Sequence, residues 1–176
     1  MLILKYQPSW ENDFEQIKNV LFHALDPTSV GIEHVGSTAV PGLGAKNIID
    51  IDLIYHNESD FNRIKTSLQN LGYFHAGDQG IEGREVFKRN GTFHHHILDA
   101  ISHHLYVCHK DNQELQRHLA FRNFLRTHED ERKAYEILKQ EIADKANQDK
   151  KEYARLKELL AKDFIEGIVA RNDFGN

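Results

Sequence analysis

The sequence predicts an α/β (α+β) protein built from one helix, a small sheet with a crossing helix, and a helical C-terminal third. Three observations support this prediction. Apolar residues recur at three- and four-residue intervals near the N-terminus, as on one face of a helix. Segments rich in β-branched residues, separated by Gly-rich loops, follow between residues 32 and 108. From Asp111 onward the helical spacing returns, with charges of both signs between the apolar positions.

The first part of the chain is expected to form a helix and two strands. The helix starts at Ser9, whose side chain is placed to cap free amide groups, and residues 26–29 end it. A short strand over 32–35 leads into a Gly/Pro-rich loop over 38–46. The strand from Ile48 to Tyr55 has apolar residues on both faces, which predicts an interior position in the sheet.

The middle of the chain is expected to complete the sheet. A helix over about 59–71 precedes a strand over 84–89. Asn90-Gly91 is a strong two-residue turn signal, so the chain after it is expected to return as an antiparallel strand. A further strand is expected over 103–108. The sheet is therefore predicted to end before residue 111.

The rest of the chain is expected to be helical. Apolar spacing predicts three helices beyond residue 111, the last running from Tyr153 to Ile168. We expect one domain over residues 1–176, with the sheet in about 1–110 and the helical part in about 111–176.

Composition restricts the class of protein. The 176 residues are 40% hydrophobic and 28% charged, and the net charge of −5 disfavours a general nucleic-acid-binding surface. The single cysteine, Cys108, allows no intramolecular disulfide, which suits a reducing compartment. There is no signal-peptide layout and no apolar run near the roughly 18 residues of a membrane span. We therefore expect a cytoplasmic protein without a membrane partner.

Two short motifs concentrate residues suited to phosphate and metal chemistry. Gly36 and Ser37 form a tight turn that can present backbone amides and a hydroxyl to a phosphate. About a dozen residues later, Asp50 and Asp52 alternate with apolar residues, so both project from the same face of a strand. Two such carboxylates can converge on Mg²⁺ or Mn²⁺, and without a cation their like charges oppose each other. The motifs predict a phosphate-and-metal pocket.

These motifs resemble a known family. Gly-Ser followed by Asp-apolar-Asp resembles the signature of the nucleotidyltransferase superfamily, and the stretch HVGSTAVPGLGAKNIIDIDLI resembles the GrpB family of uncharacterised proteins. Members of that family also occur fused to dephospho-CoA kinase. Further matches are GIEGREVF over 80–87, His104-Leu105, residues 121–126 and two Tyr-x-x-x-Lys pairs, at 135–139 and 153–157. The resemblance implies a nucleotidyltransferase-like small mixed sheet flanked by helices.

The resemblance also implies roles for particular residues. Asp50 and Asp52 correspond to the catalytic, metal-binding pair. Active nucleotidyltransferases usually add a third acidic residue from a later strand, and Glu85 and Asp99 are candidates by position. His104 is the alternative, as a ligand or base. Tyr106 stands where we expect the second histidine of a His-Leu-His pattern.

Basic residues are expected to complete the pocket. Cations that could line a phosphate-binding cleft are Lys46, Arg84, Arg122, Lys139 and Lys157. Of these, Lys157 is favoured together with Tyr153, because the family resemblance covers both. The predicted phosphate- or nucleotide-binding set is Gly36, Ser37, Lys46, Arg84, Tyr153 and Lys157.

Three functional hypotheses follow. The first is a metal-dependent nucleotidyltransferase that binds a nucleoside triphosphate and transfers a nucleotidyl group to an unknown acceptor. The second is a catalytically degenerate module that binds a nucleotide or another phosphorylated ligand. The third is a histidine-rich metal-binding protein, because imidazole is a good ligand for transition metals. Six of the 12 histidines lie between residues 94 and 109, and on a strand His94 and His96 would share a face.

Overall fold

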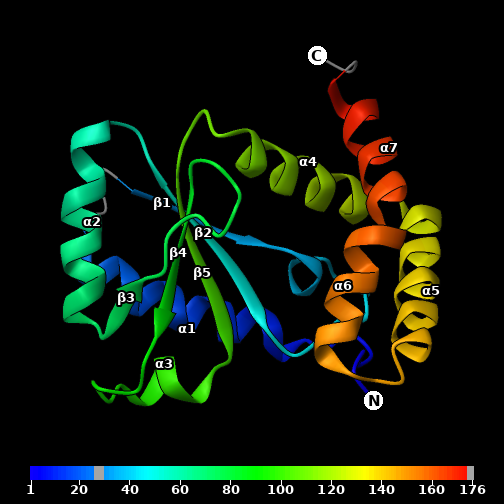
Figure 1. Ribbon diagram of the computed structural model, residues 1–176, viewed down its shortest axis with the longest axis horizontal. Helices are drawn as coiled ribbons and strands as arrows, with labels where there is room; N and C mark the ends of the chain where they lie inside the picture. The colour runs from blue at the N-terminus through cyan, green and yellow to red at the C-terminus, as the bar shows by residue number, and fades with distance from the viewer. Residues whose placement is uncertain (26–29, 174–176) are drawn as a thin grey trace.

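The computed structural model describes residues 1–25 and 30–173, so the predicted helix end at 26–29 lies outside the described residues. Within them, five strands form one sheet in the order β1-β2-β5-β4-β3 (Figure 1). Strands β2 and β5 are parallel and the other neighbours are antiparallel, which confirms the predicted fold class. The strands are β1 (Val30–Val35), β2 (Ile49–Tyr55), β3 (Tyr73–His75), β4 (Arg84–Arg89) and β5 (His103–His109).

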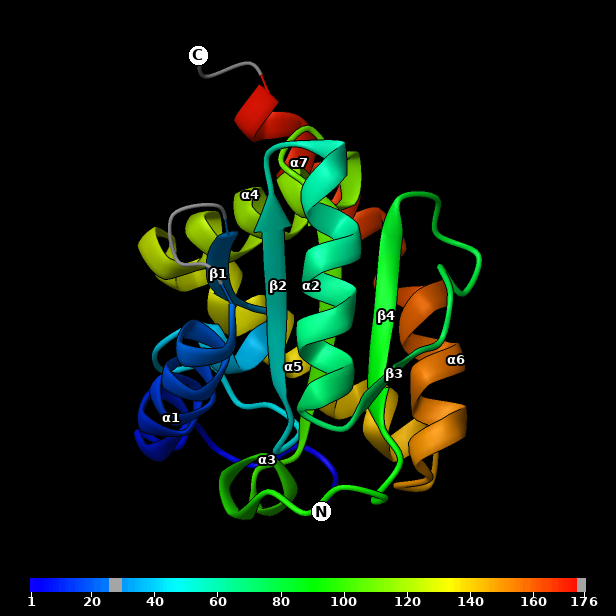
Figure 2. The ribbon, with the colours of Figure 1, turned by 90° about the vertical axis from the view of Figure 1, so that its left-hand side faces the viewer.

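One face of the sheet is apolar and covered by α1 (Ser9–Ala24), α2 (Glu58–Asn70) and the short α3 (His96–Ala100). Figure 2 shows α2 lying across this face. Alternate residues of the two central strands point into the resulting core and are at most 1% exposed; they are Ile49, Ile51, Leu53, Leu105 and Val107. Because strand side chains alternate, residues such as Asp50 and Asp52 must point to the opposite face.

That opposite face looks toward the C-terminal helices α4 (Gln113–Thr127), α5 (Glu129–Lys145), α6 (Lys150–Leu160) and α7 (Lys162–Asp173). In Figure 1, α5 to α7 stand together at the far side of the molecule from α2. They form a second core, which Ile3, Val40 and Leu43 join from the N-terminal part. None of the described helices is long and apolar enough to cross a membrane.

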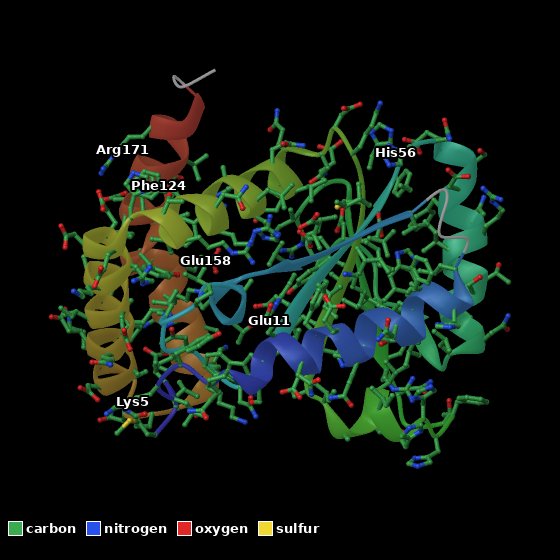
Figure 3. The ribbon with its side chains drawn as sticks, turned by 180° about the vertical axis from the view of Figure 1, so that it is seen from behind. Lys5, Glu11, His56, Phe124, Glu158 and Arg171 are labelled. Carbon is green, nitrogen blue, oxygen red and sulfur yellow. The ribbon has the colours of Figure 1, made fainter. Side chains whose placement is uncertain are left out.

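The predicted helix from Tyr153 to Ile168 is in fact two helices, α6 and α7, separated at Ala161. Ala161 is fully buried, and the chain changes direction there. This break lets α7 pack against α4. Figure 3 shows the contact between Arg171 of α7 and Phe124 of α4, where the guanidinium carbon lies 5.8 Å from the ring centre.

The predicted antiparallel strand after Asn90-Gly91 is wrong. Strand β4 already pairs with β3 on one side and β5 on the other, so it has no free edge for another strand. The chain after the turn leads instead into α3. Arg89 ties this loop down by donating to the Asp99 carboxylate at 2.7 Å and to the Phe93 carbonyl at 2.6 Å. His94 and His96 therefore do not share a strand face.

The predicted cap at Ser9 is also wrong. The N-cap position of α1 is Pro8, and no side chain caps the helix there.

His34 is a buried histidine on β1, directly beneath the Gly36 turn. Its ring stacks on Phe14 with ring centres 4.6 Å apart, and its Nε2 lies 3.0 Å from the Thr38 hydroxyl. Burial lowers the pKa of His34 to about 4, with Asp50 opposing and two arginines assisting that shift. The folded protein therefore holds this imidazole neutral.

We predict that His34 makes folding sensitive to acid. Between about pH 6.5 and pH 4, His34 binds a proton in the unfolded chain but not in the folded chain. The free energy of unfolding therefore falls as the pH falls. For this group the loss is on the order of 2–3 kcal/mol. Urea titrations at pH 7 and 4.5, followed by fluorescence of Trp10, should show a smaller loss in His34→Phe than in the wild type. Equal losses would contradict the assignment.

Candidate functional site

A cavity of about 350 Å³ lies between the polar face of the sheet and the C-terminal helices. The Gly36 turn, β2 and β5 form one wall, and α4, α5 and α6 form the others. The residues that line it and concern the chemistry are Gly36, Ser37, Lys46, Asp50, His104, Tyr106, Glu114, Arg117, His118, Phe121, Tyr135, Lys139, Tyr153 and Lys157. Most of the predicted site residues are therefore brought together.

Asp50 is the carboxylate that faces the cavity. It lies on β2 opposite His104 of the parallel strand β5. The Asp50 Oδ1 atom is 2.8 Å from His104 Nδ1, and both side chains are partly open to solvent, at 29% and 48% exposed. The β2–β5 register thus places an imidazole beside the first aspartate and leaves its ring nitrogen Nε2 for another partner.

Asp52 is buried behind Asp50, with its side chain 1% exposed. Its Oδ2 atom is 2.8 Å from His118 Nδ1 of α4, and His118 Nε2 is 3.3 Å from the Glu114 carboxylate. Burial by itself lowers the pKa of His118, but the hydrogen bonds to Asp52 and Glu114 outweigh it and raise that pKa to about 9. The hydrogen bond from His118 in turn lowers the pKa of Glu114 to about 2. His118 is therefore an imidazolium between two carboxylates.

Each aspartate gives one oxygen to a histidine and keeps the other. Asp52 Oδ1 is fully buried and has no hydrogen-bond partner among the residues that the structure describes, which is costly for a carboxylate oxygen. Asp52 is not among the residues that line the cavity, and a divalent ion held by both carboxylates would satisfy its second oxygen. No group of three or more His, Cys, Asp or Glu side chains in the described part of the chain is placed to hold a metal ion. The protein would thus supply two carboxylates, and water or phosphate would supply the rest, as Mg²⁺ prefers.

Gly36 is required for the close approach of its turn to Asp50. Its φ of +73° is unfavourable for residues with a side chain, and a Cβ atom built there would lie 2.3 Å from Asp50 Oδ2. The short 3₁₀ helix η1 (Ser37–Ala39) follows directly. Gly36 therefore lies against the second oxygen of Asp50, and Ser37 lines the same cavity.

Two lysines face the cavity without a carboxylate partner. Lys46 precedes β2 and Lys157 lies on α6, and no ion pair joins either to an acidic residue in the part of the chain that the structure describes. Burial and then Lys157 lower the pKa of Lys46, whereas Tyr135, followed by Tyr153 and Asp50, raises the pKa of Lys157. The Lys46 Nζ atom sits 5.3 Å from the ring centre of Tyr153. Lys46 and Lys157, two of the predicted cations, therefore line the same cavity as Asp50.

The cavity continues into a second hollow of about 460 Å³ along α6 and α7. The two share Lys46, Arg117, Tyr153, Lys157 and Ile165, and Glu158, labelled in Figure 3, lines only the outer one. The two lysines therefore lie where the two hollows adjoin.

Several candidates from the sequence lie away from the cavity. Glu85 projects from the opposite face of the sheet, where its carboxylate is 2.5 Å from His75 Nε2. Asp99 lies on α3, paired with Arg89. The structure thus places neither acid beside Asp50, and the position next to it on β5 belongs to His104. Candidate metal histidines near residue 94 also lie on this distant side, around α3.

Two predicted cations have other contacts. Arg84 lies on the same sheet face as Asp52 but does not line the cavity; its guanidinium carbon is 4.6 Å from the ring centre of Tyr106. Arg122 is buried, and donates to the Glu33 carboxylate at 2.6 Å and the His34 carbonyl at 2.8 Å. It holds α4 to β1.

Sequence reasoning missed Glu114, Arg117 and His118 on α4. Glu114 and His118 are four residues apart and so share one helix face, which was the available signal. That spacing is common on solvated helices. Only the packing of α4 over the sheet shows that Asp52 joins Glu114 and His118 in one hydrogen-bonded group.

Comparison with known protein families matches residues 1–171 to the family described as GrpB protein. The chain belongs to the GrpB family. A UPF0157 protein of Pseudomonas aeruginosa is 34% identical over 176 residues, covering 96% of this GrpB-family chain and 68% of the relative. The UPF0157 protein YqkA of Bacillus subtilis is 30% identical over 141 residues, and the chain spans 39% of its length. The crystal structure of conserved protein GrpB from Enterococcus faecalis has a TM-score of 0.77 at 30% identity and covers 97% of this chain and 96% of that chain.

The GrpB fold is also similar to more distant solved structures. A cytoplasmic RNA terminal U-transferase matches with a TM-score of 0.55 at 11% identity, and Cid1 in complex with its product ApU matches with 0.52 at 12%. The matches cover 82% and 81% of this chain, but only 44% and 43% of those chains. At such identities the similarity shows the fold alone, which is nucleotidyltransferase-like, as predicted.

We predict that Gly36→Ala displaces Asp50 and destabilises the protein more than a matched glycine change. The control is Gly77→Ala, which has the same φ of +73° but no atom within 4 Å of the added Cβ. The free energy of unfolding of the control should fall by about 1–2 kcal/mol from backbone strain alone. Gly36→Ala should lose at least about 1 kcal/mol more, because Asp50 must move as well. Urea unfolding measures both, and equal losses would contradict the close contact.

We also predict that His118 and Asp52 are energetically coupled. His118→Leu leaves the Asp52 carboxylate buried without a counter-charge, which should cost about 2–4 kcal/mol of unfolding free energy. Adding Asp52→Asn to that variant removes the charge and should recover part of the loss. The double-mutant cycle is measured by urea unfolding at pH 7. Simply additive losses would show that the pair is not coupled.

Proposed function

We propose that the chain binds a nucleoside triphosphate together with Mg²⁺ in this cavity and transfers its nucleotidyl group to an acceptor. The observation that carries the proposal is the polarity of the cavity: Lys46 and Lys157, which form no ion pair within the described residues, line it together with the partly exposed carboxylate of Asp50. A cavity with cations on one wall and a carboxylate on the other matches a ligand that is itself a polyanion carrying a divalent cation. The nucleotidyltransferase-like fold supports the same function.

In this proposal the free oxygens of Asp50 and Asp52 hold the cation, and the two histidines orient those carboxylates. Hydrogen-bond partners of metal-binding side chains fix the orientation of those side chains and tune their basicity. When bound, Mg²⁺ would neutralise negative charge on the phosphates as the nucleotidyl group leaves pyrophosphate. Lys46 and Lys157 would bind the phosphates on the far side, with Gly36 and Ser37 closing the turn above Asp50.

His104 is the proposed general base. Its Nδ1 atom is engaged by Asp50, so Nε2 is the nitrogen able to take a proton from the acceptor. The half-exposed ring lines the cavity, and an acceptor can enter along the outer hollow. The second candidate function, binding of a nucleotide without turnover, is favoured by the placement of His104, rather than a third acid, beside Asp50.

The proposal predicts nucleotide binding that depends on Mg²⁺ and on Asp50. Calorimetry with a nonhydrolysable nucleoside triphosphate should show binding that strengthens when Mg²⁺ is added. Asp50→Asn should abolish that strengthening, and Lys157→Met should weaken binding by roughly tenfold or more, since a charge-assisted contact is worth about 1.5–3 kcal/mol.

The matched control is Lys145→Met, an exposed lysine on α5 away from the cavity, and it should bind as the wild type does. Nucleotide binding unchanged in Asp50→Asn, or lost equally in Lys145→Met, would overturn the proposal. Transfer from an α-labelled nucleotide to solutes added as acceptors then separates the two candidate functions. Label transfer indicates an enzyme, and binding without transfer indicates the degenerate module.

A further inference from the structure

Lys139 is a lysine enclosed by protein at the inner end of the cavity. Its side chain lies on α5 and is 1% exposed, yet it belongs to the cavity wall. Its Nζ atom donates to the Gly44 carbonyl and lies 4.9 Å from the ring centre of Tyr135. A buried lysine is rare unless it is paired with an acid or used for chemistry.

The surroundings of Lys139 disfavour a positive charge on balance. No ion pair joins it to a carboxylate in the described part of the chain, and the charge with the larger effect on it, that of Lys157, is of the same sign. Burial, followed by Lys157, lowers the pKa of Lys139 well below its ordinary value, and Glu136 opposes this only in part. A neutral amine satisfies the Gly44 carbonyl with one N–H and keeps a lone pair.

The Lys139 amine lies beside the two lysines that are proposed to bind phosphate. This position suggests a specific class of ligand. We propose that Lys139 is a nucleophilic amine that captures phosphorylated aldehydes as an imine, while Lys157 and Lys46 bind the phosphate of the ligand. The capture rests on the phosphate wall of the proposed function, but it needs neither Mg²⁺ nor the aspartates. It would make the cavity a site of covalent modification by small metabolites of this class.

The reaction is balanced without a further reagent. The Lys139 lone pair attacks the aldehyde carbon, the carbon–oxygen π bond opens, and a proton moves from nitrogen to oxygen to give a carbinolamine. The hydroxyl then takes a proton, for which Lys157 is the adjacent ammonium group, and leaves as water. The product is the C=N bond of the imine, whose proton returns to the Lys157 amine or to solvent. Desolvated lysines are those that form Schiff bases in proteins.

The test uses pyridoxal 5′-phosphate as the probe on the full chain at pH 7. Imine formation is followed by absorbance, trapped with borohydride and located by peptide mass spectrometry. We expect about one label per chain, on Lys139, formed roughly tenfold or more faster than on the exposed Lys145, because burial favours the neutral, nucleophilic form of the Lys139 amine. Unphosphorylated pyridoxal should label Lys139 more slowly, since it lacks the group that the lysine wall binds.

Three variants sharpen the result. Lys139→Met keeps the volume and should remove the label, whereas Lys145→Met should retain it. Lys157→Met should slow labelling by both probes, because it removes the adjacent proton donor, and should erase the preference for the phosphorylated probe. Label spread over surface lysines, or none on Lys139 in the wild type, overturns the inference. Because mapping is done on the wild type, poor folding of a variant does not obscure the answer.

A failed capture with intact Mg²⁺-dependent nucleotide binding would overturn only this inference. If both proposals hold, a nucleoside triphosphate should slow labelling of Lys139, because it would occupy the same phosphate-binding lysines. Labelling without any nucleotide binding would support the amine and count against the proposed function.

Discussion

The site depends on how two like charges are kept on one face of a central strand. Asp50 and Asp52 are two residues apart on β2, so they point the same way and repel each other when both are ionised. The protein separates their environments. Asp50 stays half-open beside His104 of the neighbouring strand, and Asp52 is buried against His118 of α4. Each contact fixes one carboxylate oxygen, and in the proposed function the other oxygen holds the cation.

That arrangement constrains the rest of the fold. The β2–β5 pairing must be parallel and in register to bring His104 beside Asp50, and α4 must cross the polar face of the sheet to deliver His118. Since this face is polar, the C-terminal helices cannot pack flat on it and instead bury their apolar residues in a core of their own. The cavity is the space left between that core and the sheet.

Much of the fold and part of the site could be predicted from the sequence because their signals are local. The alternation in β2 indicates an interior strand, and Gly36 requires a positive φ where its turn approaches the next strand. The spacing of Tyr153 and Lys157 places both on one face of a helix, and both line the cavity. These features are set by neighbouring residues, which a single sequence displays.

The features that were missed are set by contacts between distant segments. Asp52 and His118 are 66 residues apart, and nothing in either segment alone indicates the other. Asn90-Gly91 has the chemistry of a hairpin turn, but β5 occupies the strand edge that a hairpin would need. Glu85 was a reasonable acid by position, and the pleat of β4 turns it to the opposite face. In each case the outcome is decided by the assembled sheet or by the packing of α4 on it, rather than by a local signal.

The most direct test is a crystal structure of the protein with Mn²⁺ and a nonhydrolysable nucleoside triphosphate. Anomalous scattering locates the ion independently of the surrounding density. The account predicts a manganese peak coordinated by Asp50 Oδ2 and Asp52 Oδ1, with phosphates against Lys46 and Lys157 and both histidines still bound to the aspartates. A peak in the His94–His96 segment instead, or phosphates bound away from Asp50, would contradict it.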